Sequence, residues 1–348
     1  MRIRLRAWIL VAAGLLAVGA GPAYGADTSS AESAAGSVRY TVQDLGTLGG
    51  TRSKATAIDG NTVVGSSLTR GDAAEHAFAY DLRRHTMTDL GTLGHSSQAT
   101  GVAGDYVVGE SDLSADGPTH GFAYNVRTRR LVDIGTLGGS STNITGLNGD
   151  TVVGTSSLSG DVVTHAFAYN LRTRKMTDLG TLGGSSSTAN DISGSTVVGQ
   201  SRTAGNGLTG YAYDLRTGIR TDLGAHFLTA QLISGGTVVG GDGLLASSFD
   251  LMTHTSAVIG SGRGVTEVKQ ISGNLMVGDN FAPNSFAFVA RIDDGDFTYL
   301  ASLGGLNSSA TQVNGHGVVA GSAALPSAGP FTANGPFHAA VWVPHTVS

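Results

Sequence analysis

The sequence predicts an all-β protein, a seven-bladed β-propeller, on three observations. Three short motifs recur seven times in a fixed order, at a spacing of about 45 residues, which is typical of propeller blades. Each repeat contains four short candidate strands separated by turn-forming residues, as a propeller blade does. The repetitive part also begins with one surplus strand and ends in a repeat that lacks one, so we expect the two to pair and close a ring.

The repeat is defined by an Asp-Leu-Gly block, a Val-Val-Gly block and a His-Ala-Phe block. The first block starts at Asp44, Asp89, Asp133, Asp178 and Asp222, with weaker copies near Val258 and Leu300. The second starts at Val63, Val107, Val152, Val197, Val238, Met276 and Val319. The third starts at His76, His120, His165, Thr209, Ser247, Ser285 and His338. Because the order is kept throughout, one structural unit is repeated, and its later copies are degenerate.

The first repeat shows how each strand follows from the local sequence. We expect strands at residues 55–58, 62–66, 76–82 and 86–90. The polar residues around Gly60 are typical of a tight hairpin between the first two strands. His76, Phe78 and Tyr80 alternate with alanines, which is the period of a strand. Long helices are disfavoured, because the chain has 53 glycines and keeps no 3.6-residue period.

The order of strands within a blade follows from side-chain size. The first strand of each repeat carries small residues, so we place it innermost, followed by the Val-Val-Gly, His-Ala-Phe and Asp-Leu-Gly strands. Residues 40–45 match an Asp-Leu-Gly strand, whereas the final repeat stops after its third strand near Trp342. Pairing these two ends removes two open sheet edges, which would otherwise invite aggregation. We therefore expect residues 39–348 to form a single domain.

The N-terminal segment predicts export. Arg2, Arg4 and Arg6 precede a short apolar run and a small-residue cleavage site, so residues 1–25 are predicted to be a signal peptide. The alternative, a membrane anchor, is disfavoured because an apolar run of about 12 residues is shorter than the roughly 20 that span a bilayer. Residues 26–38 are predicted to be a disordered leader, and the mature protein to be secreted.

The charge and the cysteine count restrict the possible partners. Removing three arginines from 21 basic residues leaves 18 against 26 acidic ones, a net charge near −8. This balance disfavours nucleic acid and anionic membranes as partners recognised through overall charge. The chain has no cysteine, so disulfide bonds do not contribute to its stability. We expect a monomer.

The three blocks together resemble the bacterial extracellular HAF-repeat family, named after the His-Ala-Phe block. The resemblance is close over residues 40–215 and loose over residues 216–343. Family members usually have Trp after this block, where this chain has Tyr80, Tyr124 and Tyr169, and Trp342 in the last repeat. The resemblance implies a secreted repeat protein, and it implies no catalytic residue.

The repeated polar residues predict structural rather than chemical roles. The histidines at 76, 120, 165 and 338 share one repeat position, which places them too far apart to bind one zinc ion. We expect hydrogen bonding or packing from them, and turn or blade-closing roles from the repeated aspartates. The glycine-rich block lacks the lysine of a phosphate-binding loop, and no nucleophile elbow is present. We therefore predict no catalytic residue, no cofactor and no metal.

Residues that break the repeat are the better candidates for binding. The position after Val-Val-Gly, or the next one, carries an acid at Glu110, Asp242 and Asp279, and we predict that these face one rim and bind a ligand. Solvated loop variation is the alternative. Among the three, only Asp242 and Asp279 are expected to lie close enough to act as a pair.

Three functions remain open at this stage. The first is a non-catalytic binding module for an extracellular glycan or protein partner. The second is a secreted carbohydrate-active hydrolase or lyase. It would need acids at the mouth of the ring, where the inner strands offer Asp191 and Lys269 as exceptions to Thr, Ala and Gly. The third is a structural surface protein. Fold alone does not decide among them.

Overall fold

A computed structural model describes residues 38–224, 227–241, 245–261, 266–280, 285–291, 297–326 and 335–346. The predicted signal peptide (residues 1–25) and nearly all of the predicted leader (residues 26–38) lie outside these ranges, and Val38 is the first residue of β1. Within the described part, 28 strands and one short 3₁₀ helix (Arg70–Asp72) form the secondary structure.

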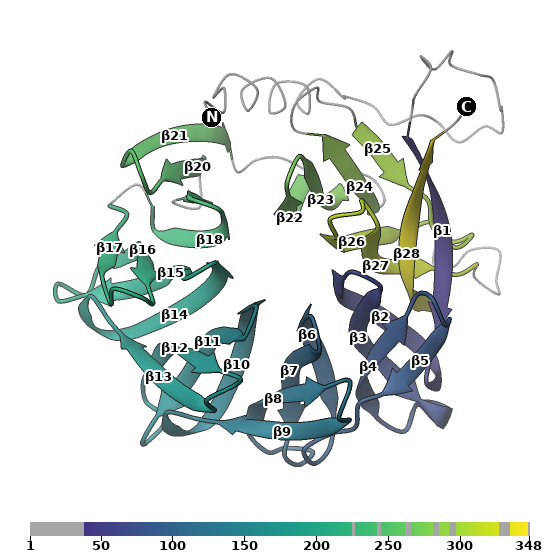
Figure 1. Cartoon of the computed structure of the whole chain (residues 1–348), viewed down its shortest axis with the longest axis horizontal. Helices are drawn as coiled ribbons and strands as arrows, with labels where there is room; N and C mark the ends of the chain where they lie inside the picture. Colours follow the sequence, from purple (N-terminus) through teal and green to yellow (C-terminus); the bar gives the residue numbers. More distant parts are fainter. Residues whose placement is uncertain are drawn as a thin grey trace. The chain divides into compact units, whose positions relative to one another are not determined.

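The strands form seven four-stranded sheets (Figure 1). The first holds β2 (Gly49–Asp59), β3 (Thr62–Thr69), β4 (Glu75–Asp81) and β5 (Thr86–Asp89). The second holds β6 (Ser97–Ala103), β7 (Tyr106–Asp112), β8 (Thr119–Asn125) and β9 (Arg130–Gly135). The third holds β10 (Gly138–Asn148), β11 (Thr151–Leu158), β12 (Thr164–Asn170) and β13 (Lys175–Gly180). The fourth holds β14 (Gly183–Ser193), β15 (Thr196–Thr203), β16 (Leu208–Asp214) and β17 (Arg220–Asp222).

The remaining sheets come from the degenerate repeats. The fifth holds β18 (Thr229–Ser234), β19 (Thr237–Gly241), β20 (Leu245–Asp250) and β21 (Thr255–Ser261). The sixth holds β22 (Thr266–Ser272), β23 (Leu275–Asn280), β24 (Phe286–Arg291) and β25 (Phe297–Leu300). The seventh holds β26 (Ser308–Val313), β27 (Val319–Ala324), β28 (Phe337–Thr346) and β1 (Val38–Gly46). In the first six sheets strands follow one another in chain order, whereas the seventh has the order β1-β28-β27-β26.

The seventh sheet confirms the prediction about the two chain ends. β1 pairs antiparallel with β28, from Val38 opposite Thr346 to Gly46 opposite Ala339. Figure 1 shows β1 beside β28. The protein is thus a seven-bladed β-propeller in which the N-terminal strand completes the C-terminal blade, as the sequence predicts. The strand order predicted within each blade, from the small-residue strand through the Val-Val-Gly and His-Ala-Phe strands to the Asp-Leu-Gly strand, is also confirmed.

By its contacts the chain divides into two compact units. Of the described residues, the terminal unit comprises residues 38–47, 51–60 and those from 266 onward, and the central unit comprises residues 48–50 and those from 61 to 261. In the central unit, buried clusters form between consecutive sheets, as where Val108 and Ile134 pack with Ile144 and Phe167. In the terminal unit, Leu300 and Val313 pack around Trp342. Each such side chain contributes about 1.5–3 kcal/mol of burial.

A buried hydroxyl ties neighbouring sheets together at the same repeat position. Ser187 accepts the amide of Ala166 at 3.0 Å and donates to the carbonyl of Gly180 at 2.6 Å. Equivalent bonds to the third-strand amide come from Ser97, Ser308 and Ser53, at 2.8–3.0 Å. Because an unpaired buried amide is costly, this serine fixes the spacing between blades.

Candidate functional site

The repeated histidines and aspartates bond to one another. His165 Nδ1 lies 2.9 Å from the Asp178 carboxylate, and the same pair forms between His76 and Asp89, His120 and Asp133, and His338 and Asp44. In each pair one carboxylate oxygen also accepts a hydrogen bond from the backbone amide of the glycine two residues later. For Asp178 the donor is Gly180, at 2.6 Å. These residues hold the third and fourth strands together, which confirms the predicted hydrogen-bonding and blade-closing roles.

Glu110 lies at the end of β7 with its side chain turned toward the next blade. Only 9% of the residue is exposed, so the acid does not project from an open rim. Oε1 accepts the backbone amide of Ile144 at 2.9 Å and the side-chain amide of Asn143 at 2.5 Å. Burial raises the pKa of the Glu110 carboxyl above its ordinary value, and the hydrogen bond from Ile144 partly offsets the rise.

Asp279 occupies the same repeat position in the terminal unit and makes the equivalent contact. It is 3% exposed, and Oδ1 accepts the backbone amide of Ala310 at 2.9 Å. Its other oxygen is paired with Lys269 and accepts the Ser309 hydroxyl at 2.9 Å. Asp279 and Lys269, predicted separately from the sequence, therefore form one ion pair within the sixth sheet, and Asp279 links that sheet to the seventh through Ser309 and Ala310.

Two further acidic residues were singled out from the sequence, Asp242 and Asp191. Asp242 lies outside the described residues, so its predicted pairing with Asp279 stays a prediction. Asp191 sits in β14, where its two carboxylate oxygens accept the amides of Ile192 and Ile233, each at 2.8 Å. Burial raises the pKa of Asp191 to about 6, and the two amide hydrogen bonds oppose the shift.

Glu110 also lines a cavity of about 200 Å³ in the central unit, which we call the acidic cavity. Its lining consists of Glu75, Ser96, Ser97, Gln98, Glu110, Asp112 and Thr119. Three carboxylates, one amide and three hydroxyls converge there, and no basic residue is among them. The cavity lies where β7 ends and β6 and β8 begin.

Asp112 is held by two hydroxyl groups of this cavity. Its oxygens accept the hydroxyls of Ser96 at 2.5 Å and Thr119 at 2.7 Å, and these bonds lower the pKa of the Asp112 carboxyl. Asp112 was not among the residues predicted from the sequence to bind a ligand. The signal was present, because residues 110 and 112 are two apart on a strand and share one face of the sheet.

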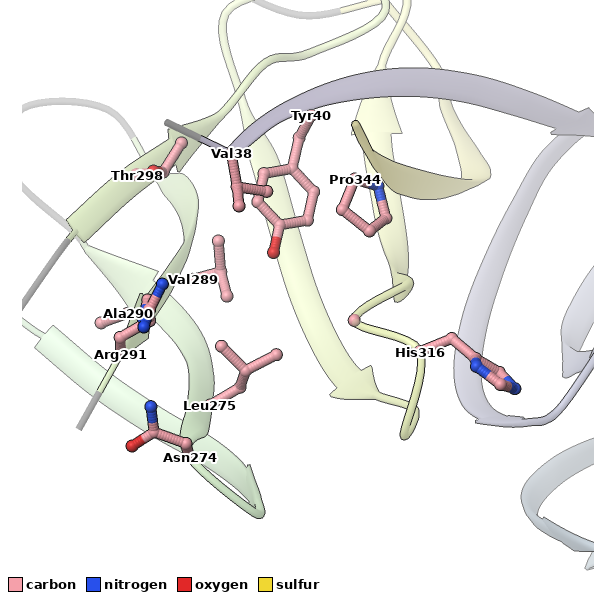
Figure 2. A pocket seen from close by; sticks show the side chains of 11 residues that line it. Val38, Tyr40, Asn274, Leu275, Val289, Ala290, Arg291, Thr298, His316 and Pro344 are labelled. Atoms are coloured by element: carbon pink, nitrogen blue, oxygen red, sulfur yellow. The ribbon is translucent and has the colours of Figure 1, made fainter. Parts of the chain in front are cut away.

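A second cavity, of about 330 Å³, lies in the terminal unit between the sixth and seventh sheets. Figure 2 shows the ring of Tyr40 beside Pro344 on one side, with Val289 and Leu275 across from them. Arg291 and Asn274 supply its polar edge. The mainly apolar lining distinguishes it from the acidic cavity.

No cluster of three or more His, Asp or Glu side chains in the described residues has the arrangement of a metal site. None of the helices in those residues is long and apolar enough to cross a membrane.

Comparison with known proteins relates the chain to solved propellers. No protein-family model matches the sequence, and no curated protein matches it either. The propeller domain of the trilobed protease from Pyrococcus furiosus is similar over 86% of this chain and 95% of its own, with TM-score 0.55 and 10% identity. The oligogalacturonate lyase from Vibrio parahaemolyticus is similar over 89% and 97%, with TM-score 0.52 and 10% identity. The likeness shows the fold alone.

Proposed function

We propose that this protein is a secreted, non-catalytic binding module for a glycan, and that the acidic cavity is where the glycan binds. The observation that carries the proposal is the lining of that cavity. Ionised carboxylates only accept hydrogen bonds, and hydroxyl side chains both donate and accept. A neutral sugar presents several hydroxyl donors on a small ring, so it matches this set of groups.

Free acceptor capacity remains in the cavity after the protein's own bonds are counted. An ionised carboxylate has about four lone-pair positions, and Asp112 uses two of them for Ser96 and Thr119. Glu75 is an exposed residue, and its Oε1 accepts the Ser66 hydroxyl. Sugar hydroxyls could therefore donate to Asp112 and Glu75 in short, charge-assisted bonds, without breaking a bond within the protein.

Secretion belongs to the same proposal. Residues 1–25 have the pattern of a cleaved signal peptide, and the His-Ala-Phe blocks resemble an extracellular repeat family. A secreted module that meets polysaccharides at the cell surface fits both features.

A carbohydrate-active hydrolase or lyase is the second candidate. It is favoured by the opposed pKa shifts of Glu110 and Asp112, because a pair of acids with pKa values pushed apart can act as acid and base. The non-catalytic proposal is better supported, since Glu110 already accepts the Ile144 amide that it would leave unpaired if it moved.

One experiment separates the two candidates. Residues 26–348 are screened against neutral oligosaccharides and cell-wall polymers, and each binding partner is then incubated with the protein for product analysis. Binding with no new reducing ends supports the module. Release of reducing ends or unsaturated products that is lost in Glu110→Gln establishes the enzyme and overturns the proposal, as does the absence of any glycan binding.

A further inference from the structure

The central unit has another cavity at the opposite end of the strands that form the acidic cavity. It has a volume of about 340 Å³, and we call it the hairpin cavity because the β8–β9 and β12–β13 hairpins border it. Its lining consists of Tyr106, Ala123, Asn125, Thr128, Arg130, Val132, Tyr169, Leu171 and Arg174. Tyr106 and Asp112 begin and end the same strand, β7, so the two cavities lie at different ends of one sheet.

The polar groups of the hairpin cavity are donors. Arg130 and Arg174 line it, and no carboxylate does. Asn125 Oδ1 is already occupied, because it accepts the amides of Arg127 and Thr128 and the Thr128 hydroxyl. Only the amide NH₂ of Asn125 is left to face a ligand. The cavity therefore suits a ligand rich in acceptors and negatively charged.

Tyr169 adds a hydroxyl and an aromatic ring to the wall of the hairpin cavity. The residue is 5% exposed, and its hydroxyl is not among the fully buried side-chain atoms that lack a partner in the described residues, so it keeps access to the cavity. Tyr80 and Tyr124 are buried to the same extent at the equivalent positions, so this burial is a feature of the repeat. The ring of Tyr169 adds an apolar face beside Leu171 and Val132.

The hairpins of this end share a left-handed turn residue. Arg129 and Arg174 hold left-handed backbone angles, with φ of 56° and 55°. Gly218 occupies the equivalent position of the β16–β17 hairpin with φ of 71°, and the same four-residue backbone bond closes all three turns at 2.8 Å. Glycine adopts this conformation without strain, whereas arginine does not. His85 and His254 hold the same angle in their hairpins, so the strained position belongs to the turn type, and only Arg174 among these residues lines the cavity.

Positive charge is concentrated at these turns although the mature chain is acidic. Ten of its 18 basic residues lie in four consecutive hairpins: Arg83, Arg84, Arg127, Arg129, Arg130, Arg172, Arg174, Lys175, Arg216 and Arg220. Four of them, Arg84, Arg127, Arg172 and Arg216, form ion pairs with aspartates. Arg130 and Arg174 have no ion-pair partner in the part of the chain that the structure describes.

The cavity of the terminal unit shows that this chemistry is not a property of every blade. It occupies the same repeat position, but Tyr40 stands where the central unit has Arg174, and Pro344 stands where it has Leu171. The lining of the terminal cavity contains one arginine, Arg291, whereas the lining of the hairpin cavity contains two.

From these observations we infer that the hairpin cavity binds a carboxylated sugar residue of an anionic polysaccharide. The guanidinium groups of Arg130 and Arg174 receive the carboxylate, for which the planar donor fork of arginine is well suited. The hydroxyl of Tyr169 and the amide of Asn125 donate to ring or hydroxyl oxygens. The tyrosine ring and Leu171 cover the apolar face of the sugar. This site is separate from the acidic cavity and does not depend on the proposed function.

The test is calorimetric titration of the protein with polygalacturonate fragments and with the same fragments after chemical reduction of their carboxyl groups. We expect binding of the carboxylated form only. Arg174→Gln and Arg130→Gln should each weaken it about tenfold, which corresponds to about 1.4 kcal/mol. Tyr169→Phe should weaken it about threefold.

Matched controls lie in the same repeat positions. Arg172→Gln changes the same hairpin at a residue that is paired with Asp150 and does not line the cavity. Tyr124→Phe changes the equivalent tyrosine of the preceding blade, which is also buried and lies outside the cavity lining. Both should change the affinity less than twofold, with unchanged melting temperatures for all variants.

The result that would overturn the inference is equal binding of the reduced fragments, or equal weakening by Arg172→Gln and Arg174→Gln. Tighter binding of a single-stranded oligonucleotide or of phosphatidylglycerol vesicles than of polygalacturonate would also overturn it, because the ligand would then be a phosphate polymer or a membrane. If the wild-type protein does not bind polygalacturonate but still binds neutral glycans at the acidic cavity, the inference about the hairpin cavity is wrong and the proposed function stands.

Discussion

Removal of β1 is the sharpest perturbation of the fold, because one strand from the N-terminus completes a sheet made at the C-terminus. A chain that begins at Thr47 lacks the partner of β28 along the whole register from Val38 to Gly46. It also loses the Asp44–His338 pair and the buried side chain of Leu45. The exposed edge of β28 then presents a row of unpaired backbone groups.

The size of the effect follows from these contacts. Burial of Leu45 contributes about 1.5–3 kcal/mol. The register joins eight residue pairs, and each backbone hydrogen bond between them contributes roughly 0.5–1.5 kcal/mol. The total is at least about 6 kcal/mol, comparable with the roughly 5–15 kcal/mol that stabilises a typical domain.

The assay is thermal unfolding of two chains, one beginning at Val38 and the other at Thr47. We predict that the first melts like the chain beginning at residue 26. The second should melt more than about 12 °C lower or fail to fold. A synthetic peptide of residues 38–46 should restore part of the loss. Melting temperatures within 3 °C of each other, a shift that corresponds to about 1 kcal/mol, would refute the reasoning.

Three further predictions follow from single side chains. Ser187→Ala should lower the free energy of unfolding by about 1–3 kcal/mol in urea titrations, because the buried Ala166 amide loses its acceptor, whereas Ser185→Ala at an exposed position should change little. Arg174→Gly should raise it by about 0.5–1 kcal/mol, since relief of the left-handed strain exceeds the entropy cost of glycine, and a loss of stability would contradict the strain argument. The carboxyl of Asp191 has a pKa of about 6 in the folded protein, above its unfolded value, so the folded state binds more protons between pH 4 and 6. Stability should therefore fall by up to about 3 kcal/mol as pH rises through this range, and Asp191→Asn should remove that slope.

The sequence predicts the repeated parts of this structure well. The alternation around Phe78 and the turn at Gly60 are local signals, and they place β3 and β4 within a few residues of their ends. The pairing of β1 with β28 joins distant parts of the chain, but the repeat predicts it. Comparison with the other repeats shows that the chain begins with a fourth strand and ends after a third strand. The first strand was predicted at residues 55–58, whereas β2 begins earlier, at Gly49.

The candidate site was less predictable, for a physical reason. Glu110 looks like a surface acid because it breaks an apolar repeat. Its partner is the amide of Ile144, 34 residues away, and only the packing of two sheets brings them together. An acid at a blade boundary can satisfy a backbone donor as well as a ligand, and sequence does not distinguish the two. The lowered pKa of Asp112 depends likewise on hydrogen bonds from Ser96 and Thr119, which belong to other strands or turns.

The central functional claim is that the acidic cavity binds a neutral glycan without transforming it. Its most direct test is calorimetric titration of the wild-type protein and Asp112→Asn with the neutral oligosaccharide that binds best, with Arg174→Gln as the control from the other end of the sheet. We predict stoichiometric binding that weakens about tenfold in Asp112→Asn and less than twofold in Arg174→Gln, consistent with the loss of one charged hydrogen bond. Equal affinity of the wild-type protein and Asp112→Asn would contradict the claim.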